Sequence, residues 1–158
     1  MIFITLGSQK FQFNRLLKEI DRLVGEGKIS EGVFAQIGYS DYKPKNYRYN
    51  EFLDREKFIE IINKCDKVIT HGGTGAIITA VKSGKKVIAI PRLAKYGEHV
   101  DDHQLQITKQ FSEMNLIIGI KEISDIEESL KLADIYEFNS YISNTNSIIR
   151  EIEKFIKN

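Results

Sequence analysis

Several kinds of residue are scarce in this sequence, and each scarcity excludes a class of protein. The 158 residues include one cysteine, Cys65, and no tryptophan. A single thiol excludes a disulfide framework and a cysteine-rich zinc site, and it favours a reducing compartment. Neither sign of charge dominates, since the sequence has 23 Lys and Arg and 22 Asp and Glu. The excess of positive charge that is typical of nucleic-acid-binding proteins is therefore missing. No apolar run approaches the ~20 residues that cross a bilayer, and the first residues lack the basic stretch of a signal peptide. We therefore expect a soluble, cytosolic protein.

What the sequence does contain is an alternation of short apolar runs with longer amphipathic ones. With 42% hydrophobic and 28% charged residues, the length suits one domain over residues 1–158. Strands are expected at residues 2–6, 33–37, 47–52, 67–70, 86–90 and 116–120. Helices are expected at residues 11–24, 55–65, 74–83, 101–114, 123–132 and 143–156. Right-handed βα crossovers turn this order into an α/β fold, a Rossmann-like parallel sheet with helices on both faces.

In such a sheet, ligands bind outside the carboxyl ends of the strands. Three loops should therefore share one rim of the molecule, namely residues 7–10, 70–75 and 91–103.

The strongest local signal is the glycine-rich segment His71-Gly72-Gly73-Thr74-Gly75, between a buried strand and a helix. Glycines allow a sharp turn and a close approach to backbone N–H groups, and the start of a helix attracts a phosphate or diphosphate. A tight turn without a ligand is the simpler alternative.

Two familiar nucleotide motifs do not match this segment. A P-loop requires its lysine at the start of the helix, whereas Gly84 and Lys85 follow the helix. A dinucleotide fingerprint requires a glycine where Ile78 stands and an acidic residue where Pro91-Arg92 stands. A mononucleotide with a diphosphate tail therefore suits the segment better.

A second cluster spans residues 91–104 and contains two of the three histidines, His99 and His103. Their spacing of four places both on one helical face if the helix begins early. Zinc is disfavoured because this spacing is not that of His-Glu-x-x-His and no thiolate is near. Side chains here, Gln104 included, suit hydrogen bonds to sugar and ribose hydroxyls, while a plain acidic helix start is the alternative. Gly7 and Ser8, after the first strand, form a weaker third candidate.

The glycine-rich segment, Gly84-Lys85, Pro91-Arg92, Glu98-His99 and His103-Gln104 together resemble the C-terminal, donor-binding half of family-28 glycosyltransferases. Residues 2–8, 13–17 and 38–40 also match a subgroup. This subgroup contains single-domain catalytic subunits of bacterial capsule and exopolysaccharide assembly, which are related to the soluble subunit of the eukaryotic two-part N-glycan GlcNAc transferase.

The resemblance implies one half of a GT-B enzyme that takes a UDP-sugar, inverts the anomeric carbon and needs no metal. A membrane-anchored partner would supply the acceptor side and a polyprenyl-linked sugar, holding this chain at the inner face of the plasma membrane. Residues implied to cradle the diphosphate are Gly72, Gly73, Thr74 and Gly75, with His71 beside them. Those implied to reach phosphate, ribose or donor sugar are Arg92, Glu98, His103 and Gln104. Gly7 and Ser8 would face the transferred sugar or the acceptor, and His99 is a candidate for the local catalytic base.

One position departs from the family pattern. Many relatives have a ribose-binding glutamate where this chain has Thr79, so either Glu98 takes that role or the ribose is held less tightly. We expect an inverting β-1,4-galactosyltransferase subunit of surface-polysaccharide synthesis. The alternatives are a UDP-glucuronic acid or UDP-GlcNAc transferase subunit, a non-catalytic nucleotide-sugar-binding module, and, more remotely, a nicotinamide-dependent reductase.

Overall fold

The structure, a computed structural model, describes residues 1–140 and Arg150. The helix predicted at residues 143–156 lies outside the described residues, apart from Arg150. The single domain over residues 1–158 accordingly stays a prediction.

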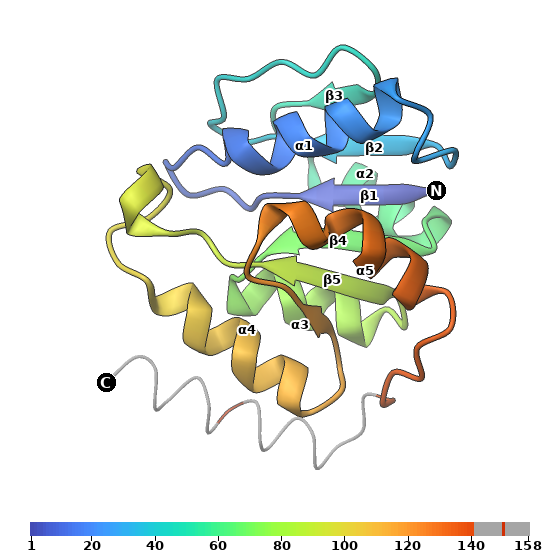
Figure 1. The fold of residues 1–158 in the computed structure, drawn as a ribbon, viewed down its shortest axis with the longest axis vertical. Coiled ribbons are helices and arrows are strands. Elements are labelled where there is room, and N and C mark those ends of the chain that lie inside the picture. The colour runs from blue at the N-terminus through green and yellow to red at the C-terminus, as the bar shows by residue number, and fades with distance from the viewer. Residues whose placement is uncertain (141–149, 151–158) are drawn as a thin grey trace.

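Six parallel strands form one sheet in the order β3-β2-β1-β4-β5-β6 (Figure 1). Their bounds are β1 (Ile2–Thr5), β2 (Val33–Gln36), β3 (Arg48–Asn50), β4 (Lys67–His71), β5 (Lys86–Ile90) and β6 (Ile118–Gly119). The helices are α1 (Asn14–Gly25), α2 (Arg55–Lys64), α3 (Thr74–Lys82), α4 (His103–Glu113) and α5 (Ile126–Ala133), with 3-10 turns η1 (Ala94–Tyr96) and η2 (Ile123–Asp125). The predicted α/β fold with a parallel sheet is confirmed.

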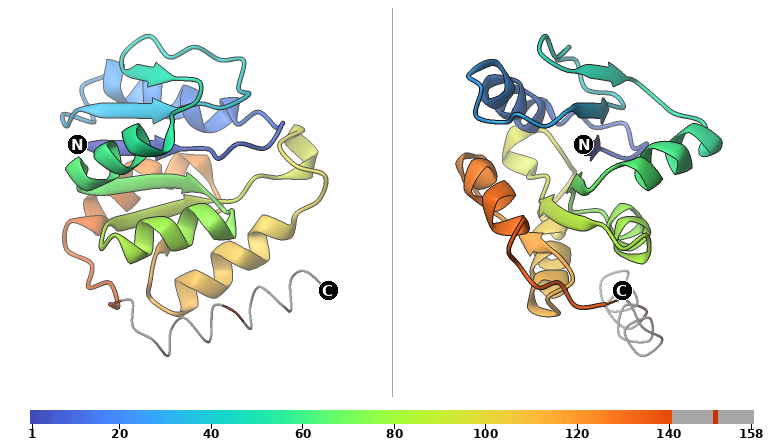
Figure 2. Two further views of the ribbon diagram at one scale, coloured as in Figure 1. Left: turned by 180° about the vertical axis from the view of Figure 1, so that it is seen from behind. Right: turned by 90° about the vertical axis from the view of Figure 1, so that its right-hand side faces the viewer.

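Helices cover both faces of the sheet, as Figure 2 shows from two further directions. Strand residues alternate between the faces because successive side chains of a strand point in opposite directions. Ile2 and Ile4 of β1 pack with α1 and α5, whereas Phe3 packs with α2, α3 and α4. Two apolar layers therefore hold the strands rigidly, and the loops at their carboxyl ends are placed by that frame.

The start of α4 differs from the prediction by two residues. Asp102 has φ −102° and ψ 26°, outside the helical range, and the helix begins at His103. The carboxylates of Asp101 and Asp102 accept backbone N–H groups of His103 and Ala94, so both acids stabilise the loop instead of lengthening the helix. The expectation that His99 and His103 share a helical face is wrong, because His99 lies in the loop.

Buried Asp21 organises the loop that joins β2 to β3. Its carboxylate accepts hydrogen bonds from the Tyr42 hydroxyl and from the backbone amides of Lys45 and Asn46. Burial opposes ionisation of this group, but these hydrogen bonds outweigh it and hold the pKa of Asp21 below its ordinary value. A helix residue thereby sets the path of a loop about twenty residues away in the chain.

We expect Asp21→Asn to destabilise the protein at pH 7 by about 1–3 kcal/mol, the cost of leaving buried donors poorly paired. Because the folded-state pKa is the lower one, the ionised carboxylate stabilises fully above the unfolded value of about 3.9. That stabilisation is lost as the pH falls through the folded pKa. Urea unfolding should show that the difference in the free energy of unfolding between the wild-type protein and the variant is smaller near pH 3 than at pH 7. Asp41→Asn, at an exposed position of the same loop, is the control, and an equal loss there would contradict the assignment.

Candidate functional site

The candidate site lies where the order of the sheet reverses. β1 and β4 are neighbours, but the chain leaves β1 toward β2 and leaves β4 toward β5, so their following loops diverge and open a crevice. Gly7 follows β1 in the left-handed region at φ 73°, and His71 ends β4. A Cβ on Gly7 would lie 2.8 Å from Nε2 of His71, and one on Gly73 would overlap Cε1 of the same ring. The imidazole thus passes between two glycines that leave it room.

Helix α3 begins at this crevice with backbone N–H groups for which the described residues provide no side-chain partner. The first intrahelical bond runs from Ile77 N to Gly73 O, at 3.1 Å, which leaves the amides of Thr74, Gly75 and Ala76 ahead of it. Gly73 has no side chain to cap them, and within residues 1–140 and Arg150 no side-chain hydrogen bond reaches them. Unpaired amides and the positive end of the helix dipole favour an anion.

Gln104 ties the loops after β4 and β5 together from the start of α4. Its Oε1 accepts the backbone N–H groups of Gly72, at 2.9 Å, and of Arg92, at 3.0 Å. Its Nε2 lies 3.1 Å from Nδ1 of His71. The two loops expected on one rim are therefore in direct contact, although the amide of Gly72 and the side chain of Gln104 are already engaged. In this structure both groups shape the loop, and their predicted contact with a ligand stays a prediction.

His71 is neutral at this position. Burial, followed by the nearby charges of Arg92 and, to a smaller extent, His99, lowers the pKa of His71 to about 3, although the hydrogen bond with Gln104 acts in the opposite direction. An uncharged imidazole can still donate one hydrogen bond toward the crevice while accepting another behind it.

Arg92 does not reach the rim as the sequence predicted. It is 1% exposed, and its guanidinium donates to the carbonyl oxygens of Leu6, Phe11 and Gln12 while lying over the ring of Phe13. Burial lowers the pKa of Arg92 to about 10. Arg92 thus joins the loop after β5 to the loop after β1, and its predicted contact with phosphate or sugar stays a prediction.

Glu98 is likewise engaged inside the protein. Its carboxylate receives Nε and an Nη of Arg15, both at 3.0 Å, and the backbone N–H of Leu93, and the residue is 0% exposed. The hydroxyl of Thr79 donates to Gly75 O. A ribose-binding role for Glu98 stays a prediction. Sequence reasoning missed Arg15, because nothing in a lone arginine near a helix start indicates a partner 83 residues away.

The remaining predicted residues lie on the rim with free surface. The ring of His99 packs on Phe11, 5.2 Å between centroids, with Nδ1 3.2 Å from the Asp101 carboxylate. His103 is half-buried at the start of α4, and Ser8 is exposed. His99 is thus held within the loop by two neighbours, which does not favour it as a catalytic base.

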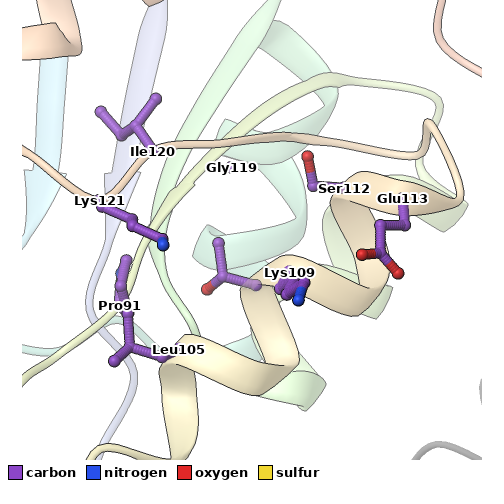
Figure 3. Close-up of a pocket in the computed structure, with 9 residues that line it drawn as sticks. Pro91, Leu105, Lys109, Ser112, Glu113, Gly119, Ile120 and Lys121 are labelled. Atoms are coloured by element: carbon purple, nitrogen blue, oxygen red, sulfur yellow. The ribbon is translucent and has the colours of Figure 1, made fainter.

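A separate pocket of about 230 Å³ lies between α4 and the segment that follows β6 (Figure 3). Pro91, Leu105 and Ile120 provide apolar walls, and Lys109 and Glu113 add charge. None of the predicted site residues lines it, so it is distinct from the crevice between β1 and β4.

Two further features of the described chain concern metals and membranes. Within residues 1–140 and Arg150, no cluster of three or more His, Cys, Asp or Glu side chains is arranged to hold a metal ion. In the same part of the chain, no helix has the length and apolar character to cross a bilayer.

A Rossmann-like sheet with an open helix N-terminus at its switch point defines an α/β domain suited to a phosphorylated nucleotide. The chain belongs to the glycosyltransferase family 28 C-terminal domain, whose sequence profile matches residues 1–134.

Two curated proteins that are similar in sequence to this chain have the same name. The UDP-N-acetylglucosamine transferase subunit ALG13 of Kluyveromyces lactis is 30% identical over 105 residues, which are 66% of this chain and 49% of that protein. Its namesake in Candida albicans is 31% identical over 102 residues, 63% of this chain and 31% of that protein. This chain therefore spans half or less of the length of these two relatives.

Solved structures share the fold. An NMR structure of ALG13 superposes with a TM-score of 0.64 at 16% identity, covering 99% of this chain and 96% of that one. The crystal structure of Acinetobacter baumannii MurG gives a TM-score of 0.58 at 15% identity. The superposition covers 96% of this chain and 49% of that one. At such identities the likeness shows the architecture alone.

Proposed function

We propose that this chain is the donor-binding subunit of an inverting UDP-sugar transferase and that its donor is UDP-GlcNAc. The observation that carries the proposal is the open N-terminus of α3 at the switch point of the sheet. Family membership supports glycosyl transfer, and the curated relatives are named for UDP-N-acetylglucosamine transfer. The comparisons thus favour the UDP-GlcNAc alternative over the expected β-1,4-galactosyl transfer in capsule synthesis, which nothing among them supports.

In this proposal the chain acts mainly on the leaving group. As an acceptor oxygen bonds to the anomeric carbon, the bond from that carbon to the diphosphate breaks and negative charge grows on UDP. The amides of Thr74, Gly75 and Ala76 and the dipole of α3 stabilise that charge without rearrangement. A metal ion is not required for this step. The acceptor hydroxyl loses its proton to a base that we assign to the partner, since His99 is packed into its own loop.

An aromatic pair on the same rim supports a nucleotide as the ligand. Tyr39 and Phe52 follow β2 and β3, are 48% and 46% exposed, and meet at 5.1 Å between ring centroids. A Cβ on Gly38 would lie 3.1 Å from Gly7 O, so Tyr39 adjoins the loop beside His71. Large exposed rings offer a stacking surface for a base. We assign the uracil to this pair.

The proposal includes a second chain. The relatives are named as subunits, and the crevice of this chain offers no identified acceptor site. We propose a membrane-anchored partner that holds a lipid-linked sugar and keeps this chain at the cytoplasmic face of the membrane.

Titration calorimetry with UDP, UDP-GlcNAc, UDP-galactose, UDP-glucuronic acid and NADPH tests the donor. We expect UDP and UDP-GlcNAc to bind, NADPH not to bind, and EDTA to leave the affinity for UDP unchanged. Binding of NADPH without UDP would overturn the transferase proposal. Tighter binding of UDP-galactose than of UDP-GlcNAc would restore the galactosyl alternative. Sugar transfer to a lipid-linked acceptor with and without the partner chain then separates a catalytic subunit from a binding module.

A further inference from the structure

The side chain of Gln104 has only one orientation that satisfies its neighbours. Two backbone N–H groups, of Gly72 and Arg92, converge on one atom of its amide at 2.9 and 3.0 Å. Only the carbonyl oxygen can accept both, so the –NH₂ group is directed at Nδ1 of His71, 3.1 Å away. With Gln104 only 3% exposed, water does not compete for these bonds.

This orientation determines which ring nitrogen of His71 carries the proton. Nδ1 faces a donor and must accept, so the hydrogen of the neutral ring resides on Nε2. Nε2 lies against Gly7, where a Cβ would approach it to 2.8 Å. Among the described residues no hydrogen bond to Nε2 is found, whereas Nδ1 is engaged by Gln104. The nitrogen that carries the proton is thus the one that lies toward Gly7 in the loop after β1, which borders the crevice.

We propose that Gln104 is a positioning residue that holds His71 as its Nε2–H tautomer, so that the ring presents a hydrogen-bond donor to an anionic ligand. The opposite tautomer would turn a lone pair toward the same anion and repel it. In this role Gln104 acts through the ring of His71. This inference rests on the proposed function for the identity of the anion, UDP, but not for the state of the ring.

The test reads the ring directly by ¹H–¹⁵N correlation NMR of histidine-labelled, ligand-free protein at neutral pH. His99→Gln and His103→Gln assign the signals, since the chain has 3 histidines. We expect the proton of His71 on Nε2. In Gln104→Glu, one carboxylate oxygen can still accept both amides while the other faces Nδ1, so a proton should appear on Nδ1. A wild-type proton on Nδ1, or unchanged ring shifts in a folded Gln104→Glu protein, would overturn the inference. If the variant does not fold, the wild-type spectrum alone decides.

The functional consequence is measured by UDP titration. Gln104→Glu should weaken binding by about tenfold or more, the usual effect of losing a hydrogen bond to a charged group. The added negative charge also repels UDP directly, and the same substitution in a His71→Asn background measures that repulsion alone. A loss as large there as in the wild-type background would contradict a role through His71. If wild-type protein does not bind UDP at all, the proposed function fails while the ring measurement stands.

Discussion

Replacing Gly73 with alanine should lower the affinity for UDP by about a hundredfold. The backbone of Gly73, at φ −81° and ψ 133°, accommodates alanine without strain, so the effect comes from the added methyl group alone. That methyl would overlap Cε1 of His71, so the ring cannot keep its position. The ring must therefore leave its bond with Gln104, which removes a donor and loosens the loop ahead of α3. Overpacking costs about 1–3 kcal/mol, and the loss of a hydrogen bond to a charged group costs a similar amount. Together they correspond to a decrease in affinity of about a hundredfold.

Calorimetric titration with UDP measures this change, and Gly75→Ala is the matched control for stability. Gly75 is two residues along the same helix start, and a Cβ there meets nothing within 4 Å. Its thermal unfolding should stay close to that of the wild-type protein, whereas Gly73→Ala should unfold at a lower temperature. Gly73→Val should abolish binding while the sheet stays folded. Unchanged affinity in folded Gly73→Ala would remove the loop from the site.

Arg15→Met should cost about 3–5 kcal/mol of folding stability, as expected when one partner of a buried ion pair is removed. Glu98 is 0% exposed, and without Arg15 its carboxylate retains only the backbone N–H of Leu93. Arg15 also lies over the ring of Tyr96, 4.5 Å from the centroid. The variant thus frees the loop after β5 from α1 as well as leaving a charge buried and unpaired.

A double-mutant cycle followed by urea unfolding measures the interaction energy between Arg15 and Glu98. Arg15→Met combined with Glu98→Gln should recover part of the loss, because the carboxylate is then no longer buried without Arg15. The recovery is incomplete, because Glu98→Gln also removes the negative charge near buried Arg92. Lys64→Met, which removes an exposed i,i+4 partner of Glu60, should change stability little. Equal effects of the buried and exposed replacements would contradict a structural role for Arg15.

Much of the frame could be predicted from the sequence because its signals are local. The apolar runs of β1, β4 and β5 mark buried strands, and the spacing of apolar residues marks the helices between them. Helix α1 nevertheless begins at Asn14 instead of residue 11, and β6 shrinks to two residues. Contacts that periodicity does not report accompany both ends: Arg92 donates to the carbonyl oxygens of Phe11 and Gln12 ahead of α1, and β6 pairs with β5 over two residues.

The sequence predicted which loops meet, but not what their polar side chains contact. The glycine-rich segment could be recognised because its glycines and the helix start are adjacent in the chain. The roles of three polar residues could not be predicted in the same way, namely Arg92, Glu98 and Gln104. Side chains of these types bind sugars and phosphates, but they bind carbonyl, carboxylate and amide groups of the protein equally well. Only the packing of distant segments decides between these tasks.

By itself, the sequence determined an alternating α/β chain with a parallel sheet and a glycine-rich turn ahead of a helix, because strand and helix patterns and glycine act over a few residues. The tertiary structure alone decided which polar side chains stay available at the rim. Leu6, Phe11 and Arg15 come from one end of the chain and meet Arg92 and Glu98 from its middle, and burial makes such pairing obligatory.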